Sequence, residues 1–520
     1  DGMSGATVSS EAIRKAVAAA IEKAGADPKK YDVKVAKTVG ADETLTADIV
    51  VVGAGASGTA AAVTAAEAGA KVIVLEKGPA VGGAGKLASG LFAVESSMQK
   101  AKYKNNPELL SQLTKDQLYK QLMDYNHYLS SASITRRVID ESSSTVDWMN
   151  KHGAKLELID WNPQQGQNPY PIRWRIYHRY VDNAGAFKNM YDAFGKLGGK
   201  LLLQTRAYDL TQDKDGNVTA VIAEKADGGK LTIKTSAVIL ASGGYGADQS
   251  LLPPKMKSFL FYGVDGETGD GLKMGEAIGA ATINMDLVKQ YPQGVETRPH
   301  HGLAATASST DTMKKSGAIY VNRDGKRFVD ENAGLGVLTD KTIEQPGSIA
   351  YIVMDDAAWK QYVAKSLEDK LVPSAESLNE WTKIVNNGHP VMAVSKSLED
   401  AAKQMGIDPK GLEATVKHWN DMVKAGSDKD FSRHLTGGLA EGGTWRIVEQ
   451  KVRYQTTLGG LKADGAMRIL KKDGSAIPGL YGAGCVVGGA NGADSMTAMM
   501  NSWAIVSGVV AAESAASYAK

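Results

Sequence analysis

One segment near the start of the chain, residues 47–78, constrains its fold more than any other: ADIVVVGAGASGTAAAVTAAEAGAKVIVLEKG. An apolar run from Ile49 to Val52 leads into a glycine-rich turn, and an alanine-rich stretch follows the turn. A second apolar run, from Val72 to Leu75, ends at Glu76. This pattern predicts a strand, a helix and a second strand parallel to the first. Units of this kind build parallel sheets covered by helices, so we expect an α/β fold.

Three glycines in the turn, Gly53, Gly55 and Gly58, follow the spacing GxGxxG. We expect Gly53 to make the tight turn, Gly55 to let backbone N–H groups approach a pyrophosphate, and Gly58 to let the helix pack closely on the strand. Glu76, at the end of the second strand, is placed to accept a hydrogen bond from a ribose 2′-hydroxyl, and its charge disfavours a 2′-phosphate. The segment therefore predicts a dinucleotide-binding site.

Two further glycine-rich loops favour FAD over a nicotinamide cofactor. The segment KGPAVGGAGKLASG, residues 77–90, follows directly, and GLYGAGC, residues 479–485, lies near the C-terminus. A nicotinamide dinucleotide does not need three such loops, whereas a longer cofactor can be wrapped by all of them.

Changes in sequence character along the chain predict a dinucleotide domain that a second domain interrupts. The first ten residues, DGMSGATVSS, resemble the end of an FMN-binding domain, so residues 1–45 are interpreted as the tail of such a domain plus a linker. Residues 46–284 form the first part of the FAD-binding domain, with a helical region at about 107–153. Residues 285–443 mix short strand and helix patterns, so we expect an inserted α+β capping domain. Residues 444–520 return to a strand, a glycine turn and a long helix, which complete the Rossmann-like FAD-binding domain.

Composition excludes several classes of function. The 520 residues carry a net charge of +2 without a basic tract, which argues against nucleic acid or an anionic membrane as partner. A single cysteine, Cys485, excludes an internal disulfide, an iron–sulfur cluster with the usual cysteine count and a multi-thiolate zinc site. No apolar run approaches the length of a membrane span. We therefore expect a small-molecule substrate and no metal.

Five ordered motifs across residues 45–515 resemble the soluble fumarate reductase family, which includes flavocytochrome c and urocanate reductase. Besides the first segment they are ILASGGYGAD (239–248), TGDG (268–271), GAIYVNRDGKRFVDE (317–331) and LYGAG (480–484). The resemblance implies noncovalent FAD, a mobile cap, and hydride transfer from flavin N5 to an activated C=C bond. It implies that the following residues bind the cofactor: Gly53, Ala54, Gly55, Ala56, Ser57, Gly58, Glu76, Lys77, Gly82, Gly83, Lys86, Leu87, Ala88, Ser89, Gly90, Ala207, Ala241, Ser242, Gly243, Gly269, Asp270, Gly484, Cys485, Thr497, Ala498 and Met499.

The charged groups of that family's active site are missing from this sequence. The family's proton-donating arginine corresponds to Leu335. Its carboxylate-binding histidine corresponds to Thr456 in QTTLGG, and its carboxylate-clamping arginine to Ser495 in NGADSM. Because a buried carboxylate without a partner is costly, we expect Thr456 and Ser495 to contact a substrate other than fumarate or succinate.

Other positions are similar to the urocanate reductases of this family. Tyr291 in QYP stands where fumarate reductases have a histidine, and Thr310 and Asp311 match the family's threonine–glutamate pair. Urocanate reductases use a tyrosine and an aspartate there to hold the imidazole of the substrate. Lys314 lies where the family's proton relay has an arginine, so Asp311 and Lys314 are expected to supply protons. Tyr291 and Tyr454 are candidate acids, because a phenol hydroxyl can hydrogen-bond a carbonyl oxygen and deliver a proton.

Several further residues stay open as an acid or an enolate stabiliser, although a solvated charge or a satisfied polar group is the more ordinary explanation of each: Arg173, Arg175, His178, Arg298, His300 and His301. Cys485 stands where the family usually has an acid. We interpret it as a small buried residue near the flavin.

The leading hypothesis is an FAD-dependent ene-reductase of anaerobic respiration that acts on an α,β-unsaturated carboxylate or enone, such as an aryl acrylate or a urocanate-like acid. One alternative is a flavin dehydrogenase that works in the opposite direction, as ketosteroid dehydrogenases do. The other is a non-catalytic flavin electron-transfer module, which the missing arginine would permit.

The first ten residues, DGMSGATVSS, predict a second flavin. Their DxxSGAT pattern resembles the end of an FMN-binding domain in which the threonine, here Thr7, is esterified to FMN phosphate outside the cytoplasm. Such a domain would pass electrons from a membrane or extracellular donor to the FAD. Because the sequence does not start with Met and shows no signal peptide, we expect a processed or trimmed extracytoplasmic product in which the FMN can be absent.

Overall fold

The computed structural model describes residues 7–31, 39–159, 175–496 and 498–520. The chain divides into two compact units. The first unit contains residues 1–251, 263–288 and 456–520, and the second contains residues 252–262 and 289–455. The second unit is therefore an insertion in the sequence of the first.

The first unit is built on a six-stranded sheet with the strand order β23, β24, β11, β2, β3, β7. In chain order its strands are β2 (Ile49–Val52), β3 (Val72–Leu75), β7 (Lys200–Leu202), β11 (Ala237–Leu240), β23 (Arg468–Leu470) and β24 (Ala476–Gly482). All neighbours are parallel except β23 and β24. Every residue of β2, β3 and β11 is buried, which explains why these strands are uninterrupted apolar runs. The predicted strand–helix–strand unit is confirmed, with α2 (Ala56–Glu67) as its helix.

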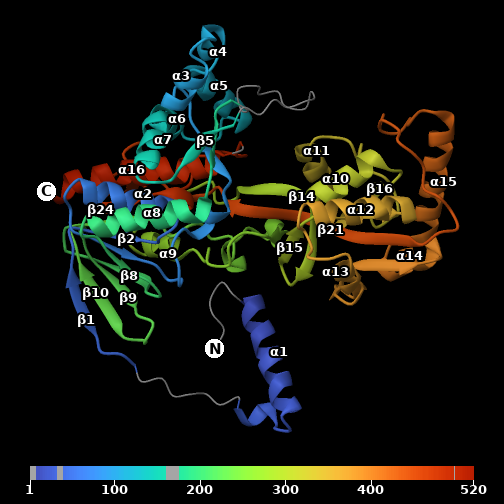
Figure 1. Ribbon diagram of the computed structural model, residues 1–520, viewed down its shortest axis with the longest axis horizontal. Coiled ribbons are helices and arrows are strands. Elements are labelled where there is room, and N and C mark those ends of the chain that lie inside the picture. Colours follow the sequence, from blue (N-terminus) through green and yellow to red (C-terminus); the bar gives the residue numbers. More distant parts are fainter. Residues whose placement is uncertain (1–6, 32–38, 160–174, 497) are drawn as a thin grey trace. The chain divides into compact units, whose positions relative to one another are not determined.

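Two different layers cover this sheet (Figure 1). On one side lie the helices α2, α8 (Asn183–Lys196) and α16 (Met499–Ala519). On the other side lies a four-stranded sheet of β1 (Glu43–Thr46), β8 (Arg206–Gln212), β9 (Val218–Glu224) and β10 (Lys230–Lys234). In this sheet β8, β9 and β10 are antiparallel, and β1 pairs in parallel with β10. Gly508 lets α16 approach α2, because a Cβ atom there would lie 2.3 Å from the carbonyl oxygen of Ser57. The mixed α/β class is therefore confirmed.

A group of short helices occupies the stretch that the sequence predicts to be helical. They are α3 (Ser97–Lys102), α4 (Pro107–Ser111), α5 (Lys115–Tyr125), α6 (Ala132–Asp140) and α7 (Ser142–Lys151). Side-chain caps define several of their starts: the Asn106 side chain accepts from the N–H of Leu109, and that of Thr114 accepts from the N–H of Gln117. A small sheet of β4 (Gly90–Phe92), β6 (Tyr177–Tyr180) and β5 (Leu156–Leu158) follows.

The second unit is built on one mixed sheet between two groups of helices. Its strands are β12 (Leu260–Phe261), β14 (Val288–Arg298), β15 (His301–Ala304), β16 (Ile319–Val321), β17 (Ile349–Met354), β20 (Met392–Ser395) and β21 (Trp445–Thr457). Its helices are α10 (Thr306–Lys315), α11 (Leu335–Ile343), α12 (Asp356–Glu368), α13 (Glu376–Asn379), α14 (Leu398–Met405) and α15 (Pro409–Ala425). Alternate residues of β17 enter two cores: Ile352 packs in one and Tyr351 in the other. Because the long strand β21 pairs with β17, the unit extends to Gln455, past the expected boundary at 443.

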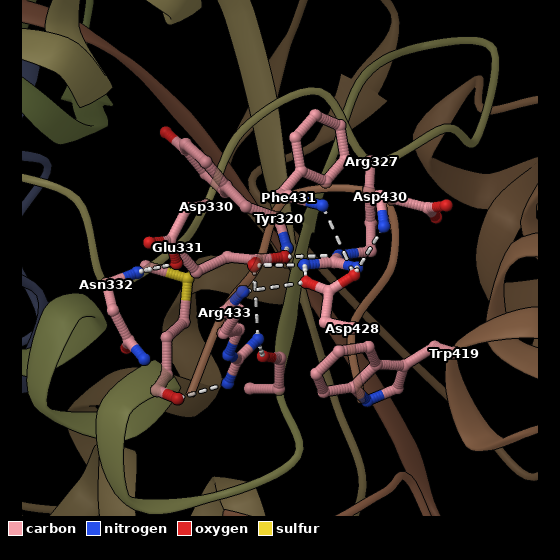
Figure 2. A network of polar contacts seen from close by, with 12 residues as sticks. Tyr320, Arg327, Asp330, Glu331, Asn332, Trp419, Asp428, Asp430, Phe431 and Arg433 are labelled. Carbon is pink, nitrogen blue, oxygen red and sulfur yellow. Dashed lines mark hydrogen bonds and ion pairs between the residues drawn. The ribbon is translucent and has the colours of Figure 1, made fainter. Parts of the chain in front are cut away.

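A buried ion network holds the RFVDE motif to the segment after α15 (Figure 2). Arg327 donates to both carboxylate oxygens of Glu331, at 2.8 and 2.7 Å, and to Asp428 at 2.9 Å. Arg433 lies 3.3 Å from Glu331, and the ring of Trp419 lies 4.5 Å from the guanidinium of Arg327 and 4.8 Å from that of Arg433. Each of these buried charges has an opposite charge beside it, which offsets the cost of removing it from water.

The N-terminal helix α1 (Thr7–Lys23) begins at the predicted flavinylation residue. The rest of the DGMSGAT pattern, residues 1–6, lies outside the described residues. Within the part of the chain that the structure describes, no helix combines the length and the apolar character that a membrane span needs.

Candidate active site

The turn between β2 and α2 shows two kinds of glycine. Gly53 has a φ of +107°, and a Cβ atom there would lie 2.4 Å from the carbonyl oxygen of Ala241. A Cβ atom at Gly58 would lie 1.8 Å from the carbonyl oxygen of Gly53. Gly55 differs, because no atom of the described residues lies within 4 Å of its Cβ position. Gly55 also caps α2 without a side-chain hydrogen bond, so the N–H groups of the first helical turn stay available to an anion.

The carboxylate of Glu76 is fixed by the backbone at the end of β3. Its Oε2 accepts from the N–H of Ala54 at 2.8 Å, and its Oε1 accepts from the N–H of Gly78 at 2.6 Å. These bonds hold the side chain beside the glycine turn. Its contact with a ribose stays a prediction.

The other two glycine-rich loops lie against the first. The N–H of Gly82 donates to the carbonyl oxygen of Ala54 at 2.7 Å, and a Cβ atom at Gly83 would lie 3.1 Å from the Cα of Gly55. At the C-terminal loop, Gly484 has a φ of +70°, and a Cβ atom there would lie 2.6 Å from the hydroxyl of Ser57. The structure therefore brings all three predicted loops together around the start of α2.

The predicted residues of the second loop differ in exposure. Lys86 and Leu87 belong to a 3-10 turn at Gly83–Leu87, and Leu87 is exposed. The carbonyl oxygen of Ala88 accepts from the side chain of Asn183, and the hydroxyl of Ser89 accepts from Tyr177.

The TGDG motif carries an ion cluster at the start of α9 (Asp270–Ala277). Asp270 lies 2.7 Å from Lys77 and 2.6 Å from Arg206, which neighbours the buried Ala207 on β8. Burial favours the neutral carboxyl, but the two cations outweigh it and hold the pKa of Asp270 below its usual range. Gly269, in a left-handed conformation, precedes the helix. Sequence reasoning missed Arg206, because nothing local marks a charged strand residue as a partner of Asp270.

Ser242 and Gly243 complete this side of the site. The hydroxyl of Ser242 accepts from the N–H of Gly271 at 3.1 Å, and Gly243 has a φ of +79°. At the far end of the C-terminal loop, Ala498 has a φ of +71° and precedes Met499, the first residue of α16. Thr497, also predicted to bind the cofactor, lies outside the described residues.

Glu267 is a buried acid that the sequence analysis did not identify. Its Oε2 has no hydrogen-bond partner among the described residues, and burial raises its pKa to about 7. It lies near Cys485, whose thiol pKa is raised to about 12 by burial and then by the negative charge of Glu267. Thr456 donates to the sulfur of Cys485 at 3.6 Å. The signal that could have identified Glu267 is its place directly before TGDG.

In the second unit, Tyr291 lies on β14 beside two cations. Its ring is 5.0 Å from the ammonium of Lys289 and 4.7 Å from the guanidinium of Arg453. The ring of Tyr262 lies 4.1 Å from the same guanidinium, and the centroids of the two tyrosine rings are 6.2 Å apart. The tyrosine predicted to contact substrate is therefore part of a cationic and aromatic cluster.

The two residues predicted to supply protons, Asp311 and Lys314, lie on α10. Asp311 is half-buried and forms its ion pair with Lys315 at 2.9 Å, one helical turn further on, whereas Lys314 is exposed. Thr310 donates to the backbone oxygen of Thr306 at 2.6 Å. Proton delivery by Asp311 and Lys314 stays a prediction.

The family's charged positions are neutral here. Leu335 is the first residue of α11, 42% exposed, and offers no proton. Thr456 and Ser495 are buried, and Ser495 donates to Asn491 at 3.0 Å. Tyr454, another candidate acid, is fully buried with its ring 5.3 Å from that of Phe261.

The remaining candidates for an acid or an enolate stabiliser are histidines and arginines near β6, β14 and β15. His178 is buried, contacts the hydroxyl of Ser96 at 2.9 Å, and has a pKa lowered to about 4 by burial, so it is neutral and structural. His300 and Arg298 lie at the turn between β14 and β15, and His301 begins β15. Arg175 lies two residues before β6, the strand that carries His178, and Arg173 lies outside the described residues.

The first unit fits an FAD cofactor. Three glycine loops surround the open space at Gly55, the N-terminus of α2 is uncapped, and Glu267 has an oxygen without a partner. The loops would hold the pyrophosphate and Glu76 the ribose. Within the described residues no cluster of His, Cys, Asp and Glu suits a metal ion.

Together the fold and this site define an FAD-dependent oxidoreductase that acts on CH–CH groups. The chain belongs to the FAD binding domain family, whose model matches residues 48–499, and to its flavoprotein reductases. It is 32% identical over 485 residues to the fumarate reductase (cytochrome) of Shewanella frigidimarina, covering 91% of this chain and 78% of the relative. It is 27% identical over 541 residues to the urocanate reductase of Eggerthella lenta, covering 100% of this chain and 83% of the relative.

The fold is similar to that of the open conformation of a flavocytochrome c3 fumarate reductase. The TM-score is 0.71 at 24% identity, and the match covers 92% of this chain and 79% of that one. The expected family and the FAD cofactor are thus confirmed, whereas the FMN at Thr7 stays a prediction.

Proposed function

We propose that this chain reduces the C=C bond of an α,β-unsaturated carboxylate or enone other than fumarate, such as an aryl acrylate or a urocanate-like acid. The observation that carries the proposal is the absence of charge at the two positions where the family clamps a dicarboxylate. Thr456 and Ser495 are 7% and 5% exposed, and neither carries a charge. A carboxylate against either hydroxyl would lose its water without gaining an opposite charge, which disfavours fumarate.

Bound FAD supplies a hydride to the β carbon of such a substrate. The protein must then stabilise the developing enolate and protonate the α carbon. Because Leu335 cannot donate a proton, we assign this step to Tyr291, whose hydroxyl can both hydrogen-bond and donate. The positive charges of Lys289 and Arg453 beside its ring support this role, because they stabilise the phenolate that remains after proton donation.

The test is anaerobic reoxidation of the reduced holoenzyme. The FAD-loaded protein is reduced with dithionite, freed of excess reductant and mixed with cinnamate, 4-hydroxycinnamate, urocanate, acrylate, fumarate and 4-phenylbut-3-en-2-one. We expect at least one compound other than fumarate to restore the oxidised flavin spectrum and to yield one equivalent of its saturated product. If none reoxidises the flavin, the proposed function is wrong.

We also propose that electrons reach the FAD through FMN esterified to Thr7, from a membrane or extracellular donor outside the cytoplasm. The DGMSGAT pattern supports this route. Co-expression with an FMN transferase should add the mass of one FMN to the peptide that contains Thr7, and Thr7→Val should abolish the addition. An unmodified peptide in the wild-type protein would exclude the route.

A further inference from the structure

Arg453 is a buried cation for which the described residues supply no counter-ion. It lies on β21 and is 4% exposed. Its Nη2 donates to the hydroxyl of Thr306 at 2.8 Å, whereas Nε and Nη1 find no hydrogen-bond partner in the part of the chain that the structure describes. Burial lowers the pKa of Arg453, and the side chains that oppose this shift are Tyr262 and Tyr291, not a carboxylate of the described residues. A charge in this state costs free energy that an anionic partner would recover.

The other two buried arginines of the second unit each lie beside a carboxylate. Arg327 shares Glu331 and Asp428, and Arg433 lies 3.3 Å from Glu331 (Figure 2). At these two positions the second unit pairs a buried guanidinium group with a carboxylate. Arg453 departs from that pattern.

The surroundings of Arg453 hold its guanidinium in one orientation. The ring of Tyr262 lies 4.1 Å from it and the ring of Tyr291 lies 4.7 Å from it. The hydroxyl of Tyr262 is in turn fixed by donation to Gln455 at 3.0 Å. Aromatic rings beside a guanidinium stabilise its positive charge by cation–π attraction, but they do not supply the negative charge of a counter-ion.

We propose that Arg453 binds the carboxylate of the substrate, and that the substrate is an unsaturated monocarboxylate. This inference rests on the proposed function. Arg453 lies beside Tyr291, the proposed proton donor. It supplies one anionic subsite in place of the two clamps that the family uses for a dicarboxylate. The N–H groups of Nε and Nη1 donate to the carboxylate oxygens.

The test measures binding without turnover. The oxidised holoenzyme is titrated calorimetrically with three saturated acids, propanoate, 3-phenylpropanoate and 3-(imidazol-4-yl)propanoate, and with the methyl ketone that matches each. Wild-type protein should bind at least one acid about thirtyfold or more tightly than its matched ketone. Arg453→Met should weaken that acid on the order of a hundredfold and change the ketone by less than about threefold.

Two further variants separate binding from structure. Arg453→Lys keeps the charge and should retain part of the acid preference. Arg446→Met is the control, because Arg446 lies on the same strand but pairs with Asp356 at 2.8 Å, and it should leave both ligands unaffected. Equal losses of acid and ketone affinity in Arg453→Met would assign Arg453 a structural role and overturn the proposal. A wild-type protein without acid preference would overturn it as well.

The outcomes also separate this inference from the proposed function. Acid binding that depends on Arg453, without reoxidation of the flavin by any unsaturated compound, would retain the subsite and refute the reductase. Reduction of the neutral enone without an Arg453-dependent acid preference would retain the reductase and refute the subsite.

Discussion

Substitution of Gly58 by alanine should mainly lower the stability of the protein, whereas substitution of Gly55 should mainly lower its affinity for FAD. Gly58→Ala places a methyl group 1.8 Å from the carbonyl oxygen of Gly53, so α2 must move away from the turn. Overpacking of a well-packed site costs about 1–3 kcal/mol, and we expect at least that loss of stability. Gly55→Ala meets no atom of the described residues within 4 Å and has an extended φ of −73°, which alanine adopts readily. The apoprotein should lose less than about 1 kcal/mol, the usual scale of an N-cap change.

Gly55→Ala should weaken the binding of FAD. Its methyl group would enter the space assigned to the pyrophosphate, so FAD affinity should fall by about tenfold or more, as expected for a lost backbone hydrogen bond. Chemical denaturation of the apoproteins gives the stabilities, and flavin fluorescence titration gives the affinities. A Gly55→Ala protein that is as destabilised as Gly58→Ala, or that keeps wild-type FAD affinity, would refute the assignment of the two glycines.

Three other substitutions test the remaining groups. Glu331→Gln removes the carboxylate beside Arg433, so it should destabilise the second unit by about 3–5 kcal/mol in urea unfolding. The control Glu344→Gln breaks an exposed ion pair and should cost less than about 1 kcal/mol. Equal small losses of stability in the two variants would contradict the role assigned to the buried ion network. Burial raises the pKa of Glu267 to about 7 in the folded state, whereas its ordinary value of 4.5 holds in the unfolded state. Between these two pH values the folded state keeps a proton that the unfolded state has lost. The contribution of Glu267 to stability therefore falls as the pH rises from 4.5 to about 7 and is constant above pH 7. Glu267→Gln should remove this decline from the pH profile of apoprotein unfolding, and an unchanged profile would exclude it. Tyr291→Phe should slow reoxidation of the reduced flavin about a hundredfold with little change in substrate affinity, and an unchanged rate would exclude Tyr291 as the acid.

The parts of the molecule that depend on local sequence were predictable. Ile49–Val52 and Val72–Leu75 are strands with the predicted bounds, because a buried parallel strand must be apolar at every position. The GxGxxG spacing identified the turn, because Gly53 and Gly58 each exclude a side chain for a different steric reason. Steric requirements that act within a few residues were therefore recognisable in the sequence.

The parts that depend on long-range contact were not predictable. Arg453, Tyr262 and Tyr291 come from separate strands, and only their packing in one sheet brings them together. Asp311 forms its ion pair with Lys315, at the i+4 position of the helix, and proton supply by Asp311 and Lys314 stays a prediction. That Arg453 has no counter-ion among the described residues becomes visible only from the folded chain, because its neighbours come from distant parts of the sequence.

The most direct test of the central claim compares two oxidants of the reduced flavin under the same anaerobic conditions. The second-order rate constant for reoxidation is measured for fumarate and for the most reactive unsaturated monocarboxylate of the panel. Because Thr456 and Ser495 carry no charge, we predict that the monocarboxylate reacts at least about tenfold faster, the effect of about 1.4 kcal/mol of transition-state stabilisation. Equal or faster reaction with fumarate would contradict the account.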